Sequence, residues 1–194
     1  VAHLARREAA GGKVNGLRAL VPGAGRAWDA LALAASGYTV EAWDIAPTAV
    51  SSANELVNEA PDLRSRVNVT CRDFFDAKSD AAMFDLVWDC TFLCALPKSA
   101  REAWAQRSSA LLKRGGTLIS CVFPILPPSH PKVLSGSGPP FAVNVALVRG
   151  LLEPHGFVLD ETQSVFDLPE SEQHLPGKMP DVKSGLLVFI KPTE

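Results

Sequence analysis

The stretch VPGAGRAWDALALA, residues 21–34, decides the fold class of this chain. It starts at the end of an apolar run, passes two glycines, Gly23 and Gly25, and continues directly into an alanine-rich helical pattern. A tight turn from strand to helix presents the backbone N–H groups of the helix start to a charged small molecule. The stretch therefore predicts a strand, a ligand-binding turn and a helix, and leaves the ligand open.

Apolar runs alternate with helix-period segments along the rest of the chain, as in a mostly parallel sheet covered by helices on both faces. Strands are predicted at residues 18–21, 39–43, 67–72, 84–90, 116–123, 157–166 and 185–191. Helices are predicted at residues 27–36, 46–60, 99–113 and 143–153. A chain of 194 residues fits one such domain, so we expect a single doubly wound α/β domain over residues 1–194.

A proline- and glycine-rich segment, PILPPSHPKVLSGSGPP at residues 124–140, is predicted to be a long irregular loop. It follows the fifth predicted strand at the carboxyl edge of the sheet, where α/β proteins place their ligands. Long loops at this position are typical of lids and binding loops, and a plain surface insertion is the alternative.

Composition and charge limit the partners. With 19 basic and 21 acidic residues and no block of like charge, the chain lacks the pattern of a nucleic-acid or acidic-membrane binder, so a small molecule is expected. The four cysteines, Cys71, Cys90, Cys94 and Cys121, lack zinc spacing and lie in apolar segments, so we expect reduced, buried thiols and no metal site. No long apolar run or secretory signal is visible, and a cytoplasmic protein is expected.

Three ligand classes compete for the glycine turn. A triphosphate-binding loop needs a Lys-Ser or Lys-Thr pair after the glycines, and none follows at that spacing. A dinucleotide turn needs a third glycine, where this chain has Trp28, which we expect to obstruct the contact between helix and strand. A nicotinamide dinucleotide therefore stays as the alternative.

S-adenosylmethionine fits the pattern better, because it has no pyrophosphate and requires only a tight turn. Asp44 ends the second predicted strand, where an acidic side chain can bind both ribose hydroxyls. Asp73 and Phe74 follow the third strand and could bind the adenine amino group and ring, although a phenylalanine at this position is more often part of the core. The three strand ends together favour S-adenosylmethionine as cofactor and S-adenosylhomocysteine as product.

The residues also resemble a known family. The carrying segments are VPGAGRAWDALALA, EAWDIAPTAV (residues 41–50), FDLVWDCTFLCALPKSAREAWAQRSSALLKRGGTLISCVFP (84–124), GPPFAV (138–143) and LLEPHGF (151–157). They are similar to the thiopurine methyltransferase-like family, especially its thiol and halide methyltransferase branch, over residues 17–157. The long block at 84–124 is far more specific than any glycine motif.

This resemblance implies a class I methyltransferase fold, with a seven-stranded sheet whose last strand is antiparallel and with methyl transfer to a small soft nucleophile, either a thiol or a halide- or hydrosulfide-type anion. Such acceptors need little proton chemistry, because a thiol is already partly ionised at neutral pH; if a base acts, position favours Asp89. The acceptor-binding residues implied are Phe92, Pro124 and Phe141. The cofactor-binding residues implied are Gly23, Ala24, Gly25, Asp44, Ile45, Asp73, Phe74 and Cys90.

The chain departs from the family pattern at several positions. Ala24 and Ala27 stand where the family usually has cysteine and glycine, and Cys90 stands where many relatives carry tyrosine. Relatives also have a leading segment of several dozen residues that closes over the site, whereas about 17 residues precede the first predicted strand here. We therefore expect a short or absent lid, and the alternative function is a catalytically impaired relative that binds the cofactor or a partner.

Overall fold

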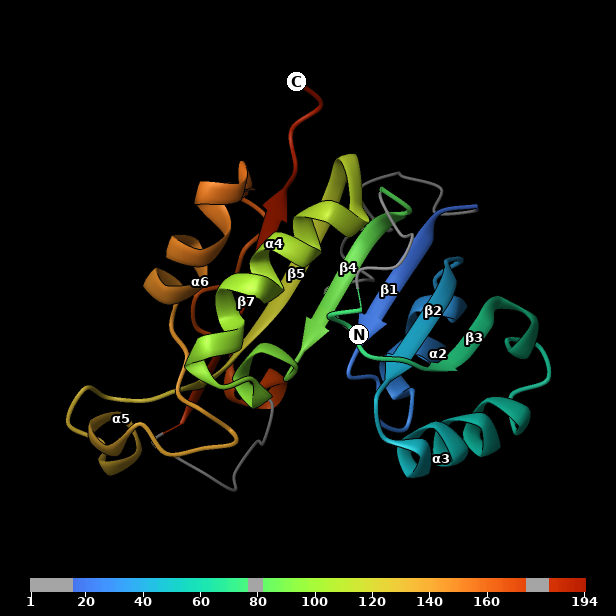
Figure 1. Cartoon of the computed structure of the whole chain (residues 1–194), viewed down its shortest axis with the longest axis horizontal. Coiled ribbons are helices and arrows are strands. Elements are labelled where there is room, and N and C mark those ends of the chain that lie inside the picture. The colour runs from blue at the N-terminus through green and yellow to red at the C-terminus, as the bar shows by residue number, and fades with distance from the viewer. Residues whose placement is uncertain (1–15, 77–81, 174–181) are drawn as a thin grey trace.

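A computed structural model describes residues 16–76, 82–173 and 182–194, and Figure 1 shows their arrangement. Seven strands form one sheet in the order β3-β2-β1-β4-β5-β7-β6. All neighbouring pairs are parallel except those of β7, which runs antiparallel to β5 and β6. The strands are β1 Arg18–Pro22, β2 Thr39–Asp44, β3 Val67–Cys71, β4 Phe84–Cys90, β5 Leu112–Ile125, β6 Val158–Leu159 and β7 Lys183–Ile190. The predicted fold class is confirmed.

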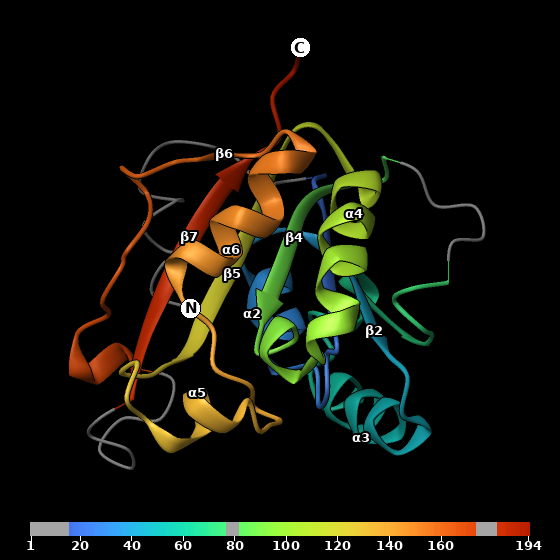
Figure 2. The same cartoon turned by 60° about the vertical axis from the view of Figure 1, so that its left-hand side comes forward.

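Helices cover both faces of the sheet (Figure 2). The helices are α2 Trp28–Ala35, α3 Pro47–Asn58, α4 Arg101–Leu111, α5 Pro131–Ser135 and α6 Val145–Leu152. Helices α2 and α3 pack on one face, and α4 and α6 pack on the other. Short 3₁₀ turns, η1 Arg64–Arg66, η2 Leu93–Ala95, η3 Lys98–Ala100, η4 Glu153–His155 and η5 Glu170–Glu172, complete the connections. None of the helices in these described ranges is long and apolar enough to cross a membrane.

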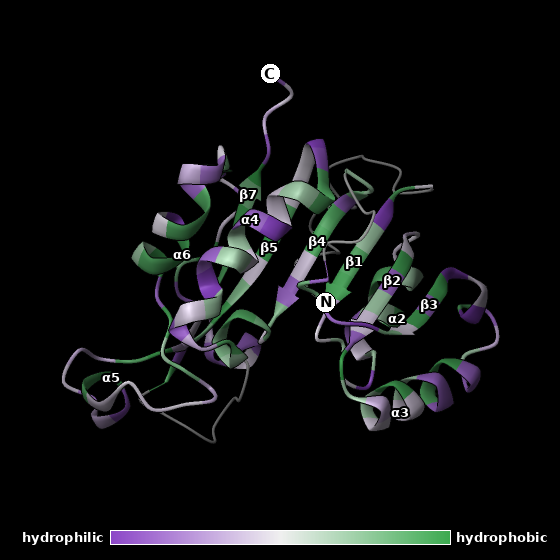
Figure 3. Cartoon of the chain, viewed as in Figure 1, coloured by the Kyte–Doolittle hydropathy of each residue, from purple (hydrophilic) through white to green (hydrophobic). Residues whose placement is uncertain are grey.

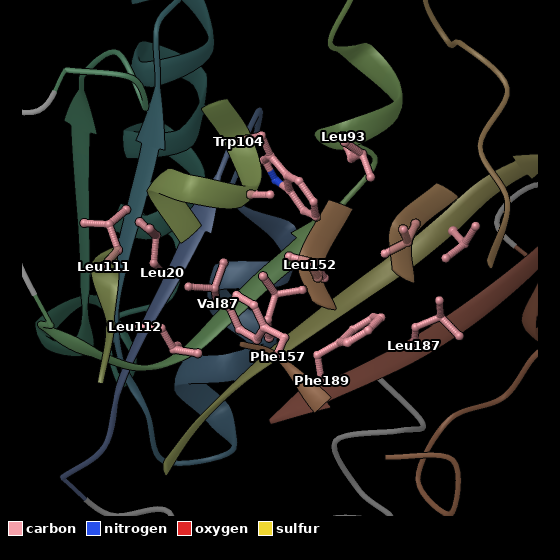
Figure 4. Close-up of a cluster of buried hydrophobic side chains, with 14 of the residues drawn as sticks. Leu20, Val87, Leu93, Trp104, Leu111, Leu112, Leu152, Phe157, Leu187 and Phe189 are labelled. Carbon is pink, nitrogen blue, oxygen red and sulfur yellow. The ribbon is translucent and has the colours of Figure 1, made fainter. Parts of the chain in front are cut away.

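The central strands are apolar along nearly their whole length because both of their faces are buried. In β4, Val87 packs under α4 and α6, whereas its neighbours Leu86 and Trp88 pack under α2 and α3. Figure 3 shows this as green colour along the central strands. Figure 4 shows the hydrophobic cluster on the face covered by α4 and α6, in which Trp104 and Leu152 from these helices pack against the sheet. This core fixes the carboxyl ends of β1 to β4 at one edge.

The four long helices begin and end within two residues of their predicted bounds. Strand β5 is longer than predicted, since it begins directly after α4. The Lys191 ammonium binds the carbonyls of Ser109 and Leu112 at this junction. The predicted loop at residues 124–140 is partly wrong, since it contains α5. His130 caps this short helix by accepting a hydrogen bond from Lys132 N, 3.2 Å away, and Gly136 ends it in a left-handed conformation.

The predicted strand at 157–166 is wrong over most of its length. Only Val158–Leu159 pairs as β6. The carboxylate of Asp160 then accepts hydrogen bonds from the backbone N–H groups of Thr162 and Gln163, which folds the chain into a turn. The chain rejoins the sheet at a single bridge between Val165 and Leu186.

The prediction for the cysteines holds only in part. All four are free, but Cys71 is exposed, and Cys90, the last residue of β4, and Cys121, its register partner in β5, are half-buried. Cys94 is buried as expected, although it lies in η2 and not in a strand, and burial raises the pKa of its thiol to about 12. Strand residues next to the carboxyl edge are less covered than their apolar context suggests.

Ala27, just before α2, is both fully buried and strained. Its φ of 63° is left-handed, a conformation that costs a residue with a Cβ roughly 1–2 kcal/mol. We therefore expect Ala27→Gly to raise the free energy of unfolding by up to about 1 kcal/mol, after the greater chain entropy of glycine is subtracted. Urea unfolding measures this, with Ala53→Gly, inside α3, as a control that must lower stability. If Ala27→Gly is less stable than the unsubstituted chain, the Ala27 backbone is not strained.

Candidate cofactor site

The glycine turn lies at the carboxyl end of β1 and leads into α2. Gly23 and Gly25 both have left-handed backbones, with φ values of 60° and 54°. A Cβ on Gly23 would lie 2.5 Å from a ring carbon of Phe92, so only glycine lets this ring approach the turn. The N–H of Ala24, between the glycines, donates to the Trp43 carbonyl at 3.0 Å and joins the turn to β2. Ala24 and Gly25 therefore shape the turn through their backbone.

Asp44, the last residue of β2, holds the turn from the side. Its Oδ2 accepts a hydrogen bond from Gly25 N at 2.8 Å, and its Oδ1 accepts one from Ala46 N at 2.9 Å. A carboxylate oxygen has more than one acceptor site, so both oxygens can bind a further hydroxyl group. Asp44 thus has a structural role in addition to the predicted ribose contact.

A cavity of about 270 Å³ opens beside this turn, at the ends of β1, β2 and β3. Its floor is aromatic, with the Phe74 ring 5.1 Å from that of Phe92 and 5.3 Å from that of Phe75, both edge to face. Asp73, at its exposed side, uses Oδ1 to accept the Phe75 N–H at 2.9 Å. The residues lining this cofactor cavity are Gly23, Trp43, Asp44, Ile45, Arg72, Asp73, Phe74, Phe75, Phe92 and Leu96.

The cofactor cavity brings together five of the eight predicted cofactor residues, namely Gly23, Asp44, Ile45, Asp73 and Phe74. Ala24, Gly25 and Cys90 do not line it. Phe92, predicted for the acceptor, lies in this cavity against the glycine turn.

Four lining residues are not among the predicted site residues, namely Trp43, Arg72, Phe75 and Leu96. Of these, Arg72 stacks on Trp43, with its guanidinium 4.3 Å from the ring centroid. Their place in the sequence could have indicated three of them, because Trp43, Arg72 and Phe75 lie within two residues of the predicted site residues at the strand ends.

The expectation that Trp28 obstructs the contact between helix and strand, and so disfavours a dinucleotide, is wrong. Trp28 is 61% exposed, and its ring lies beneath the Arg26 guanidinium at 5.7 Å, so it obstructs nothing. The fully buried Ala27 occupies the contact between helix and sheet instead.

A second cavity, of about 310 Å³, lies between α5 and the starts of α4 and α6. Phe141, predicted for the acceptor, lines it, and the Phe141 N–H donates to the Cys94 carbonyl at 2.7 Å. Pro124 lies outside the lining of both cavities, and its carbonyl accepts the Val143 N–H at 3.2 Å. The predicted acceptor residues therefore do not converge on one cavity.

Comparison with known proteins assigns the family. The model of the thiopurine S-methyltransferase family matches residues 3–181. The chain belongs to this family. It is 38% identical over 157 residues to the Arabidopsis thaliana protein named probable thiol methyltransferase 2, covering 81% of this chain and 64% of that protein. It is 35% identical over 140 residues to thiocyanate methyltransferase 1 of Arabidopsis thaliana, covering 72% of this chain and 58% of that protein.

The fold agrees with this thiopurine S-methyltransferase assignment. Magnesium protoporphyrin IX methyltransferase from Synechocystis PCC 6803, solved with S-adenosylhomocysteine, superposes with a TM-score of 0.73 at 18% identity, over 98% of this chain and 80% of that one. The chain spans about three fifths of the length of the curated relatives above. The expected short front end, residues 1–15, lies outside the described residues.

Asp89, predicted as the base of this thiopurine S-methyltransferase family member, lies 1% exposed beneath the site and lines neither cavity. Its Oδ1 accepts the N–H groups of Phe92 and Leu93, both at 3.2 Å, and so holds the turn that carries the Phe92 ring. Burial raises the pKa of Asp89 from its usual 3.8 to about 6, against the opposing effect of these two hydrogen bonds.

This raised pKa makes stability depend on pH. Because the folded pKa exceeds the unfolded one, Asp89 reduces stability as the pH rises from about 4 to 6, by about 3 kcal/mol in total. Asp89→Asn keeps an oxygen for the two N–H groups and does not titrate. We expect the stability of Asp89→Asn relative to the unsubstituted chain to rise by about that amount between pH 4 and pH 7.

Urea unfolding of both proteins across this pH range measures the difference. Asp62→Asn, at an exposed position after α3, is the control and should show little pH-dependent difference. A difference between Asp89→Asn and the unsubstituted chain that stays constant with pH would refute the buried ionisation.

Proposed function

We propose that this chain binds S-adenosylmethionine in the cofactor cavity and transfers its methyl group to a small soft nucleophile, a thiol or a halide- or hydrosulfide-type anion. The observation that carries the proposal is Asp44, which ties the glycine turn of β1 to the end of β2 and still has acceptor sites for a ribose. Names of thiol and thiocyanate methyltransferases among the relatives support the acceptor class.

Each strand end would bind a different part of the cofactor. Gly23, at the cavity, would leave room for the methionine portion, and Gly25 would shape the turn through its backbone. Asp44 and the neighbouring Ile45 hold the ribose, and Asp73 with Phe74 binds adenine. Ala24 would act through the backbone of the turn, and Cys90 lies at the end of β4, outside the lining of the cavity.

The chemistry requires alignment more than proton transfer. When bound, S-adenosylmethionine supplies a methyl group on a positively charged sulfur, which is a good leaving group. The protein has to bring the acceptor in line and exclude water, as the aromatic floor of Phe74, Phe75 and Phe92 would do. A thiol is partly ionised at neutral pH and a halide needs no base, so buried Asp89 serves to position Phe92.

Transfer of a labelled methyl group tests the proposal. The chain is incubated with S-adenosylmethionine that carries a deuterated methyl group. Each of three acceptors, hydrosulfide, iodide or benzenethiol, is added in a separate reaction. We expect labelled methanethiol, iodomethane or thioanisole by mass spectrometry, and strong loss of product in Asp44→Ala. A protein that binds S-adenosylhomocysteine but labels none of these acceptors would overturn the proposed activity and leave the cofactor assignment standing.

A further inference from the structure

The second cavity is positively charged. Three cations line it: Lys98 before α4, Arg101 at the start of α4, and Lys132 in α5. No aspartate or glutamate is among its lining residues, and neither lysine forms an ion pair within the described ranges. The Lys98 ammonium extends towards the end of α5, to 3.7 Å from the place of a Cβ on Gly136. The cations therefore surround a space that lacks a counter-charge.

Arg101 is the buried member of this cluster. It is 5% exposed, and its Nε donates to the Leu96 carbonyl at 3.4 Å. Its guanidinium lies 5.7 Å from the ring centroid of Phe141, which lines the same cavity. Its Nη2 is buried and has no hydrogen-bond partner among the residues that the structure describes. A buried guanidinium N–H without a partner is costly, and an anionic ligand in the cavity would satisfy it.

The starts of α4 and α6 both line this cavity, through Arg101 and Asn144. Figures 1 and 2 show the two helices above α5. Helix α4 has no capping side chain at its start; it continues from the 3₁₀ turn η3, and the Arg101 N–H donates to the Lys98 carbonyl. In α6, Asn144 lines the cavity and caps the helix by accepting the Leu147 N–H at 2.8 Å. The positive ends of both helix dipoles add to the charge of the three cations and favour an anion.

The two cavities share a wall. Leu96 lines the cofactor cavity, and its carbonyl accepts the hydrogen bond from Arg101 of the second cavity. Phe92 and Arg101 lie at the two ends of the same connecting segment. The two cavities are therefore neighbours along this segment.

We infer that this cavity binds the carboxylate of the methyl acceptor, so that the preferred acceptors are organic thiols carrying a carboxylate a few bonds from sulfur. The inference rests on the proposed function. The thiol loses its proton to solvent and its sulfur bonds to the methyl carbon, while the pair of the broken carbon–sulfur bond stays on the donor sulfur. Lys98, Lys132 and Arg101 hold the carboxylate and take no part in this step.

A matched pair of acceptors tests the inference. We compare 3-mercaptopropionate with its neutral amide, 3-mercaptopropionamide, as methyl acceptors. Because hydrogen bonds to charged groups are strong, kcat/KM should favour the acid by about tenfold or more. The Lys98→Ala/Lys132→Ala variant should lose most of this preference and keep its kcat/KM for the amide. Arg64→Ala/Arg149→Ala removes two exposed charges elsewhere and should retain the preference.

Binding of butyrate, which has no thiol, gives a readout independent of methyl transfer. NMR titration should show butyrate, but not butyramide, shifting signals of residues around the second cavity, with at least about tenfold weaker binding in Lys98→Ala/Lys132→Ala. Butyrate binding without methylation of either thiol would retain the anion site and overturn the proposed function. Equal methylation of acid and amide, or butyrate binding that the double substitution leaves unchanged, would overturn the inference.

Discussion

Asp44→Ala is expected to weaken the binding of S-adenosylhomocysteine by roughly a hundredfold, because two hydrogen bonds to a charged group contribute about 3 kcal/mol together. The substitution also removes the acceptor of the Gly25 N–H, 2.8 Å away, and so loosens the glycine turn before any ligand binds. Calorimetric titration measures the affinity, and urea unfolding measures the accompanying loss of stability.

Two further variants separate these effects. Asp44→Asn keeps one side-chain oxygen and should fall between the unsubstituted chain and Asp44→Ala in affinity. Asp62→Ala removes an exposed acid away from the cavity and should bind normally. Unchanged affinity in a folded Asp44→Ala protein would exclude the ribose contact.

Gly23→Ala is expected to damage both folding and ligand binding. Its φ of 60° costs a side chain roughly 1–2 kcal/mol, and the new Cβ would lie 2.5 Å from the Phe92 ring. We expect the free energy of unfolding to fall by about 2–4 kcal/mol, since the ring must also move. Because the displaced ring lines the cofactor cavity, S-adenosylhomocysteine should bind at least about tenfold more weakly, at a cost above 1.4 kcal/mol.

A second glycine provides the control. Gly150 lies inside α6, where an added Cβ meets no atom within 4 Å, so Gly150→Ala should be neutral or stabilising by up to about 1 kcal/mol. Gly23→Ala/Phe92→Leu should recover the part of the loss that comes from the ring and retain the part that comes from the backbone. If Gly23→Ala unfolds at the same urea concentration as the unsubstituted chain, the close contact is wrong.

The strand ends were predictable because a parallel sheet collects the carboxyl ends of its strands at one edge. Local patterns placed Gly23, Asp44 and Asp73 at three such ends, and the strand order alone brings them to one cavity. The direction in which a side chain points could not be predicted from the local sequence. Trp28 sits one residue after the buried Ala27, so its side chain points to solvent and not against the sheet.

Other features depend on contacts between distant segments. The apolar run continues past Asp160 and predicts a strand there, yet the Asp160 carboxylate folds the next residues into a turn. The second cavity joins Arg101 of α4 to Lys132 of α5, about 30 residues later, inside a segment predicted to have no regular structure. Such a cluster becomes visible only when the helix positions are known.

The central claim is that the edge formed by β1, β2 and β3 binds S-adenosylmethionine. Calorimetric titration of the chain with S-adenosylhomocysteine tests it most directly, with NAD⁺ titrated in parallel as the alternative ligand. We expect one-to-one binding of S-adenosylhomocysteine, no binding of NAD⁺, and loss of the signal in Asp44→Ala. Absence of S-adenosylhomocysteine binding by folded protein, or binding of NAD⁺ in its place, would contradict it.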